Sequence, residues 1–196
     1  LWNGGIGTYI KASTETHADA DDRSNDAVRI DATQLRAKVL GEGGNLGLTQ
    51  RARIEAALVR GVRLNNDAVD NSAGVDLSDH EVNLKILLNR AVARGELTTE
   101  QRNTLLEQMT DEVAQLVLQD NDAHGRQLSR DQIRSKRNVF PFARAIAFVE
   151  REFGRDRSTL QRPSDAELER RAAAGQGLTR PELAVLSSWV KMDVKR

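Results

Sequence analysis

Three polar side chains follow short apolar runs in this sequence and could bind a polar ligand. Asn45 lies in a glycine-rich stretch after the apolar run 39–40, and Asn71 follows the apolar run 62–64. Ser78 comes a few residues later. An asparagine amide donates and accepts hydrogen bonds at once, as recognition of a carboxamide or of ribose hydroxyls requires. A serine at a helix start suits a carboxylate, because free N–H groups and partial positive charge lie there.

A strand, a helix and a second strand would bring these side chains to one edge of a sheet. The run 39–40 predicts the first strand, and a helix is expected from about Thr49 to Gly61, because glycine is typical of a helix C-terminus. The run 62–64 predicts a second strand, parallel to the first. Ligands of open α/β sheets bind outside the carboxyl ends of the strands. Both polar turns therefore fall where a ligand would bind.

Each candidate also has a structural explanation, which the residues alone leave open. A dinucleotide fingerprint needs GxGxxG, whereas after Gly41 and Gly43 the third glycine falls one residue late, at Gly47. The stretch therefore does not match the tight phosphate-binding turn. Asparagine is common in turns of every kind. Ser78 and Glu81 have the spacing of a capping box, so Ser78 is predicted to be a helix N-cap.

The rest of the sequence predicts helices. Capping-box pairs occur at Ser78 and Glu81, Thr98 and Gln101, Ser129 and Gln132, Ser164 and Glu167, and Thr179 and Glu182. Pro141 is expected to kink or restart a helix. In the helix after Thr49, we expect Ile54, Ala57 and Leu58 to form the apolar face. The predicted fold is α/β, with a partial Rossmann-like parallel sheet in residues 1–77, followed by a mainly α-helical region in residues 78–196.

The composition is that of a globular chain and excludes several functions. Lys plus Arg and Asp plus Glu are equal at 29 each, and aromatic residues make up 4%. We therefore expect no nucleic-acid partner and no membrane partner. No cysteine is present, which excludes disulfides and thiolate chemistry. No apolar run approaches the roughly 18 residues of a membrane span. Because the chain begins at Leu1 without methionine, we expect it to be a piece of a longer protein.

A group of ionisable residues near position 80 has the types of metal ligands but not their spacing. Asp76, Asp79, His80 and Glu81 lie close together, yet they lack the HExxH pattern. Acidic residues in the first turn of a helix are already explained by the helix dipole. We therefore predict no metal site.

Four longer strings, in one order along the chain, resemble a known enzyme family. WNGGIGTYIK, GEGGNLGLTQ, DNSAGVDLSDHEVNLKILLN and GLTRPELAVL are together similar to the large NAD-specific glutamate dehydrogenases of bacteria. GEGGN followed by DNSAGVDLSDHE resembles the pattern in which an EGAN-type turn and an NAGGVxxSxxE segment line the nicotinamide and the substrate. The resemblance covers almost the whole chain.

The resemblance implies that NAD is the cofactor and that L-glutamate and 2-oxoglutarate are substrate and product. The implied cofactor-binding residues are Asn3, Gly4, Glu42, Gly43, Asn45 and Asn71. Asn45 would contact the nicotinamide ribose and Asn71 the nicotinamide amide, while Glu42 would brace the turn. Ser78 would contact the side-chain carboxylate of the amino acid. Asp79 and His80 replace aromatic residues of the smaller glutamate dehydrogenases, so the lining of the substrate pocket stays open.

No catalytic residue is expected in this chain. In the family, the reactive lysine and the proton-shuttling carboxylate lie upstream, and Lys38 and Lys85 do not match them. Hydride transfer is the chemistry of the cofactor. We therefore expect the isolated chain to be inactive. For the parent protein, we expect a cytoplasmic homo-oligomer. Two alternatives are an NAD-dependent dehydrogenase of another amino acid and a non-catalytic helical module for assembly or regulation.

Overall fold

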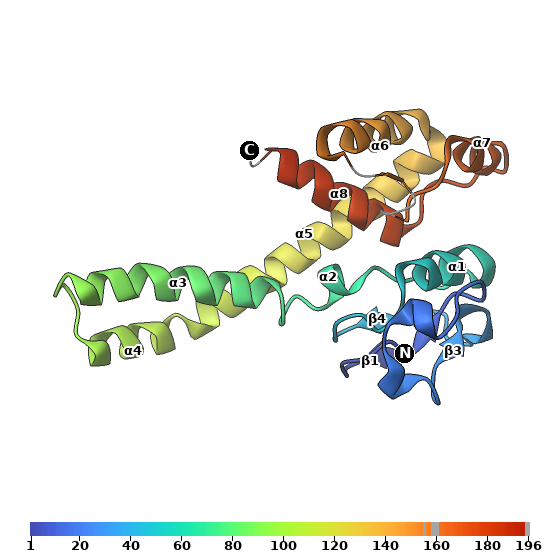
Figure 1. Cartoon of the computed structure of the whole chain (residues 1–196). Coiled ribbons are helices and arrows are strands. Elements are labelled where there is room, and N and C mark those ends of the chain that lie inside the picture. The colour runs from blue at the N-terminus through green and yellow to red at the C-terminus, as the bar shows by residue number, and fades with distance from the viewer. Residues whose placement is uncertain (155, 158–160, 195–196) are drawn as a thin grey trace.

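The computed structural model describes residues 1–154, 156–157 and 161–194. The chain is mostly helical, with a small parallel sheet near its N-terminus (Figure 1). All described strands lie within the first 42 residues, and long helices follow from Asp76 onward. This order agrees with the predicted succession of an α/β part and a helical part. None of the described helices is long and apolar enough to cross a membrane.

Parallel segments lie side by side in the first part of the chain. Strand β1 (Trp2–Asn3) pairs with strand β4 (Gly41–Glu42) in parallel. Val39, just before β4, forms a parallel bridge with Arg63. The run around Arg63 is therefore the predicted parallel neighbour of the run around Val39, although the pairing is limited to one bridge. The run around Arg63 is the third parallel segment of the sheet. The turns after β1, after β4 and after this third segment therefore lie at one edge.

A second parallel pair and three short 3-10 helices complete this part. The pair is β2 (Ile10–Lys11) with β3 (Ile30–Asp31), and the 3-10 helices are η1 (Ala18–Ala20), η2 (Arg23–Asn25) and η3 (Ala32–Gln34). Ile10 also bridges Leu48 in parallel, so β2 is joined to the segment that leads into the next helix.

Helix α1 (Gln50–Arg60) packs on the sheet, and its ends are as predicted. The hydroxyl of Thr49 accepts a hydrogen bond from Ala52 N at 3.0 Å, and Gly61 has the left-handed conformation, φ 64°. The predicted apolar face was only partly right: Ala57 is half-buried against the core, but Leu58 is exposed and the fully buried residues are Ala52, Arg53 and Ala56. A rule that counts only apolar residues misses Arg53. Its charge can be buried because it has a charged partner.

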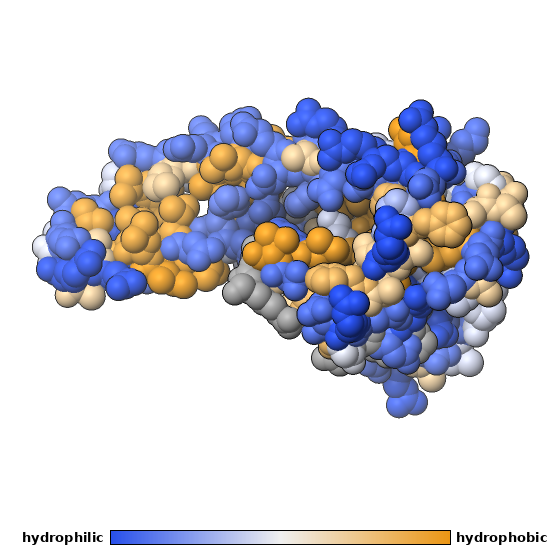
Figure 2. Space-filling view, turned by 90° about the horizontal axis from the view of Figure 1, so that it is seen from above, coloured by the Kyte–Doolittle hydropathy of each residue, from blue (hydrophilic) through white to orange (hydrophobic). Residues whose placement is uncertain are grey.

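The next helices form an arm that extends away from the rest of the molecule (Figure 1). They are α2 (Asp67–Asp70), α3 (Asp76–Ala93), α4 (Thr99–Gln108) and α5 (Thr110–Arg137). The arm consists of α3, α4 and the first half of α5, and α3 contacts both of the others. Figure 2 shows apolar side chains gathered on it. The exposed apolar residues of the arm include Val82, Ile86, Leu87, Leu116 and Leu118.

The last helices pack around the second half of α5. They are α6 (Phe140–Phe153), α7 (Asp165–Ala173) and α8 (Arg180–Val194). Their core contains Leu128, Val139, Ile146, Val149, Leu168, Leu178, Leu183 and Leu186. Pro141 lies in the first turn of α6, so the predicted restart of a helix there is confirmed. A T-shaped contact between the rings of Phe153 and Trp189, with centroids 4.9 Å apart, joins α6 to α8.

Thr98, Ser164 and Thr179 are confirmed as helix N-caps, but two predicted caps were wrong. Helix α3 begins at Asp76, so Ser78 lies inside its first turn. The helical turn starts early because Leu77 N already donates to Ser72 O. Ser129 lies in the middle of α5, and its hydroxyl donates to Gly125 O at 2.8 Å. A hydroxyl that bonds the carbonyl one turn back does not need a helix end, so spacing alone does not define a cap.

Candidate functional site

Two of the predicted ligand contacts meet at the edge of the sheet. Asn71 Nδ2 donates to Asn45 Oδ1 at 2.8 Å, so the turn after β4 and the turn after α2 are joined side chain to side chain. Asn45 is exposed and Asn71 is half-buried. Among the described residues, no other side-chain hydrogen bond occupies Asn45 Nδ2 or Asn71 Oδ1. One donor and one acceptor therefore remain free at this edge, which is the pattern that a carboxamide complements.

Glu42 lies beneath this edge and braces it. Its side chain is fully buried and accepts two hydrogen bonds from Arg53, at 2.7 and 2.8 Å, and one from Leu48 N at 3.1 Å. Burial raises the pKa of the Glu42 carboxyl, because the loss of hydration outweighs the attraction of Arg53. These hydrogen bonds hold the Glu42 side chain beneath the glycine turn, where the resemblance implies a bracing role.

Two aspartates of α2 hold the same turn from the side. Asp67 accepts a hydrogen bond from Leu46 N at 2.8 Å and pairs with Arg53 at 3.2 Å. Asp70 accepts one from Glu42 N at 3.1 Å. Sequence reasoning missed all three of Arg53, Asp67 and Asp70. The signal that could have found the aspartates is their place one and four positions before Asn71, whereas nothing local marks Arg53.

The turn after β1 packs against the turn after β4. Asn3 O accepts a hydrogen bond from Gly43 N at 2.8 Å, and a Cβ on Gly44 would lie 2.9 Å from the carbonyl carbon of Gly5. Asn3 Nδ2 is buried next to Gly47, without a hydrogen-bond partner among the described residues. Gly44 is thus required by a close backbone approach, and Gly47 leaves room for the side chain of Asn3.

Gly4 and Ser78 are exposed, and among the side-chain hydrogen bonds of the described residues none joins either one to Asn45 or Asn71. Gly4 lies beside the ring of Trp2. Ser78 lies in the first turn of α3, one short loop after Asn71. The chain brings Ser78 close to Asn71 in sequence, and its exposed hydroxyl is free to face a ligand.

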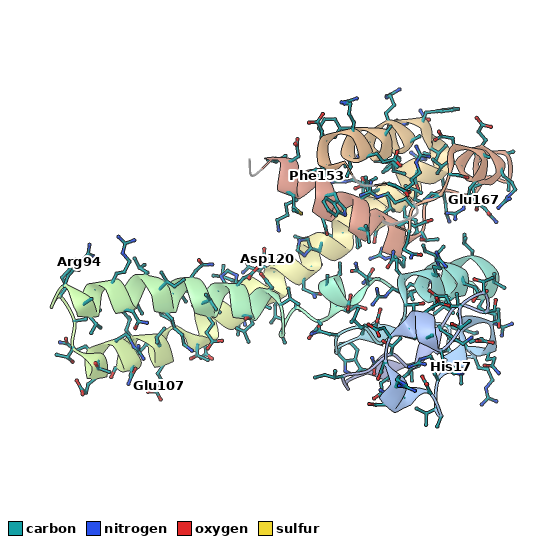
Figure 3. The ribbon with its side chains drawn as sticks, viewed as in Figure 1. His17, Arg94, Glu107, Asp120, Phe153 and Glu167 are labelled. Carbon is teal, nitrogen blue, oxygen red and sulfur yellow. The ribbon has the colours of Figure 1, made fainter. Side chains whose placement is uncertain are left out.

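Asp76, His80 and Asp120 place their ligand-type atoms within 4.8 Å of one another. Asp120, labelled in Figure 3, comes from α5, whereas the other two residues belong to the first turns of α3. His80 Nε2 lies 3.8 Å from a carboxylate oxygen of each aspartate. When His80 is protonated, its contact with Asp120 is an ion pair that joins the start of α3 to α5, and its contact with Asp76 is an ion pair within α3.

A cleft of about 920 Å³ lies between the sheet and the C-terminal helices, and neither Asn45 nor Asn71 lines it. Its wall includes Trp2, Gly41, Asn65, Asp70, Ser129 and Arg180. None of the residues predicted to bind cofactor or substrate lines it. The candidate site is therefore an exposed edge of this chain, and the cleft is lined by other residues.

Parallel segments with polar turns at their carboxyl ends define this chain as an α/β protein with a candidate ligand-binding edge. A profile described as "Bacterial NAD-glutamate dehydrogenase, catalytic domain" matches residues 1–131. The chain belongs to this family. It is 53% identical to the NAD-specific glutamate dehydrogenase of Pseudomonas aeruginosa and 51% identical to those of Halomonas elongata and Mycobacterium tuberculosis, each over 195 residues. Each comparison covers the whole chain but only 12% of the relative's length.

Proposed function

We propose that this chain is part of an NAD-dependent glutamate dehydrogenase, which oxidatively deaminates L-glutamate to 2-oxoglutarate and ammonia. The observation that carries the proposal is the hydrogen-bonded pair of Asn45 and Asn71, which joins the turn after β4 to the turn after α2 and leaves one donor and one acceptor free. Family membership and the names of the curated relatives support it. In this proposal, residues 1–77 form part of a Rossmann-like cofactor domain, and residues 78–196 form the helical region.

The described residues fit the nicotinamide end of the cofactor. NAD, when bound, accepts the hydride from the substrate. Asn71 would present its amide oxygen to the carboxamide, and Asn45 would donate to the ribose. Asn3, Gly4 and Gly43 would shape the backbone around the ribose, while the buried Glu42 would keep this turn in place. The contribution of the chain is to orient the reacting carbon, because misplacement of about 1 Å already costs a large part of the rate.

The full-length protein tests this proposal directly. We expect it to form NADH with L-glutamate, and to form far less with leucine or phenylalanine, as absorbance of NADH would show. The isolated 196-residue chain should form none, because the family resemblance implies that the reactive lysine lies upstream of these residues. Equal rates with leucine would favour the dehydrogenase of another amino acid. Activity of the isolated chain would show that its own residues suffice for catalysis.

Replacing Ser78 should separate substrate binding from cofactor binding. In the full-length protein, Ser78→Ala is expected to raise the KM for glutamate about tenfold, because a hydrogen bond to a charged carboxylate is lost. The KM for NAD should change less than about twofold. Steady-state kinetics with each substrate varied in turn measure both. Ser188→Ala is the control, since that hydroxyl donates to Ala184 O within α8. Equal changes in both KM values would contradict a carboxylate contact.

The arm is the part of this chain best suited to assembly, so we propose that the full-length protein is a homo-oligomer. Val82, Ile86 and Leu87 on α3 are 50%, 56% and 60% exposed. Exposed apolar residues that gather in one region are typical of protein interaction surfaces. Light scattering of the full-length protein measures its oligomeric state, and a monomeric mass would contradict the proposal.

A further inference from the structure

Arg180, the first residue of α8, joins three distant parts of the chain. Its Nε donates to Asn65 Oδ1 at 2.7 Å. Its Nη1 donates to Ser129 Oγ at 2.7 Å, and its Nη2 donates to Gly125 O at 3.3 Å. One side of the guanidinium is therefore tied to α5, and the other side is tied to the polar segment that follows the third parallel segment of the sheet.

The hydrogen bonds continue from Asn65 to the candidate cofactor turns. Asn65 Nδ2 donates to Asp70 Oδ1 at 2.6 Å. The other carboxylate oxygen of Asp70 accepts from Glu42 N at 3.1 Å. Asp70 also directly precedes Asn71 in the chain. A continuous path of hydrogen bonds thus runs from the start of α8 to Asp70, the residue before Asn71, and on to the backbone of β4.

This path has only one possible orientation. A guanidinium carries only donors and an ionised carboxylate carries only acceptors. The amide of Asn65 must therefore turn its oxygen toward Arg180 and its NH₂ group toward Asp70. If the guanidinium is removed, the amide of Asn65 can rotate away from Asp70. The carboxylate of Asp70 then loses both a fixed donor and a nearby positive charge, and its hold on Glu42 N weakens.

We propose that Arg180 is a positioning residue for the cofactor turns, acting through Asn65 and Asp70. The inference rests on the proposed function, since it concerns the same site. Arg180 contacts none of the predicted ligand-binding residues, and it is 115 positions away from Asn65 in sequence. The start of α8 belongs functionally to the NAD site because it fixes the geometry of the segment that carries Asn71.

The first test is a kinetic comparison in the full-length protein. Arg180→Met keeps the length of the side chain but removes every donor. We expect the KM for NAD to rise about fivefold, the effect of one lost hydrogen-bond contribution, while kcat changes less than about twofold. Asn65→Ala should raise this KM similarly. The double variant should be no worse than Asn65→Ala alone, because both changes interrupt one path.

Ser187→Ala is the matched control for the docking of α8 against α5. It removes the hydrogen bond from Gln127 Nε2 to Ser187 Oγ, 3.0 Å long, and leaves Arg180 untouched. This variant should keep the KM for NAD of the wild type. If it raised that KM as much as Arg180→Met, general docking of α8 would explain the effect and the inference would be wrong. An unchanged KM in Arg180→Met would also overturn it.

Hydrogen exchange separates this inference from the proposed function. In the full-length protein, Arg180→Met should speed exchange of the Glu42 N–H, whereas Ser187→Ala should not. This measurement needs no activity. If the wild type forms no NADH from glutamate, the proposed function fails, and exchange alone still decides whether the path exists. Unchanged exchange in Arg180→Met would refute the path even in an active enzyme.

Discussion

Arg53→Met should lower the free energy of unfolding of this chain by about 3–5 kcal/mol, because it leaves a buried carboxylate without its charged partner. Glu42 is fully buried, and Arg53 supplies two of its hydrogen bonds. Arg53 also pairs with Asp67, so a second acid loses its partner in the same variant. The turn that carries Asn45 is held by both acids, and it should loosen together with the loss of stability.

Urea unfolding of wild type and variant measures this effect. Arg51→Met is the matched control, because Arg51 is an exposed arginine of the same helix whose hydrogen bond to Gln161 is open to solvent, and it should change the unfolding free energy by about 1 kcal/mol or less. Changing Glu42 and Arg53 together to apolar residues should cost less than Arg53→Met alone. If the Arg53 and Arg51 variants unfolded alike, the pair would not stabilise the turn.

The cost of Arg53→Met should also depend on pH. Burial already raises the pKa of Glu42, and without Arg53 the hydrogen bond from Leu48 N opposes this effect much less than the ion pair did. A carboxyl with a raised pKa in the folded state favours folding most when it is protonated, and it loses that contribution as pH rises through the folded-state value. The difference between variant and wild type should therefore shrink as the pH falls toward the ordinary range of glutamate. A constant difference would show that Glu42 is not the group left unpaired.

Gly44→Ala should damage the candidate site, because the added methyl group would overlap backbone atoms. The new Cβ would lie 2.9 Å from the carbonyl carbon of Gly5 and closer still to its oxygen. Because both contacts are with backbone, no side-chain rotation relieves them. Overpacking of this kind costs about 1–3 kcal/mol. The turn must move away from Gly5, and Asn45 would move with it, so the KM for NAD of the full-length protein should rise as well.

Gly125→Ala is the control for this substitution. A Cβ on Gly125 meets nothing within 4 Å, and the residue lies inside α5, so the change should stabilise the chain by about 0.5–1 kcal/mol. Thermal unfolding of the two variants should give shifts of opposite sign. A Gly44→Ala chain as stable as the wild type would mean that the two turns do not pack as closely as described.

Local patterns predicted a large part of the fold. The ends of α1, the caps at Thr98, Ser164 and Thr179, and the restart at Pro141 depend on residues a few positions apart, so a short stretch contains the whole cause. The polar turns were found for the same reason, because asparagine and glycine after an apolar run mark a strand end. The spacing rule failed at Ser78 and Ser129, where a neighbouring turn of helix satisfies the backbone.

Contacts between distant segments could not be predicted from such patterns. The pairing of Arg53 with Glu42 and the link from Arg180 to Asn65 join residues whose positions are set by the packing of α1 and α8. A buried charge looks like a surface charge in a sequence, because only the surrounding elements exclude water from it. The residues thus specify which side chains are available at each turn, while the packing of distant helices sets which of them are free for a ligand and which are held as supports.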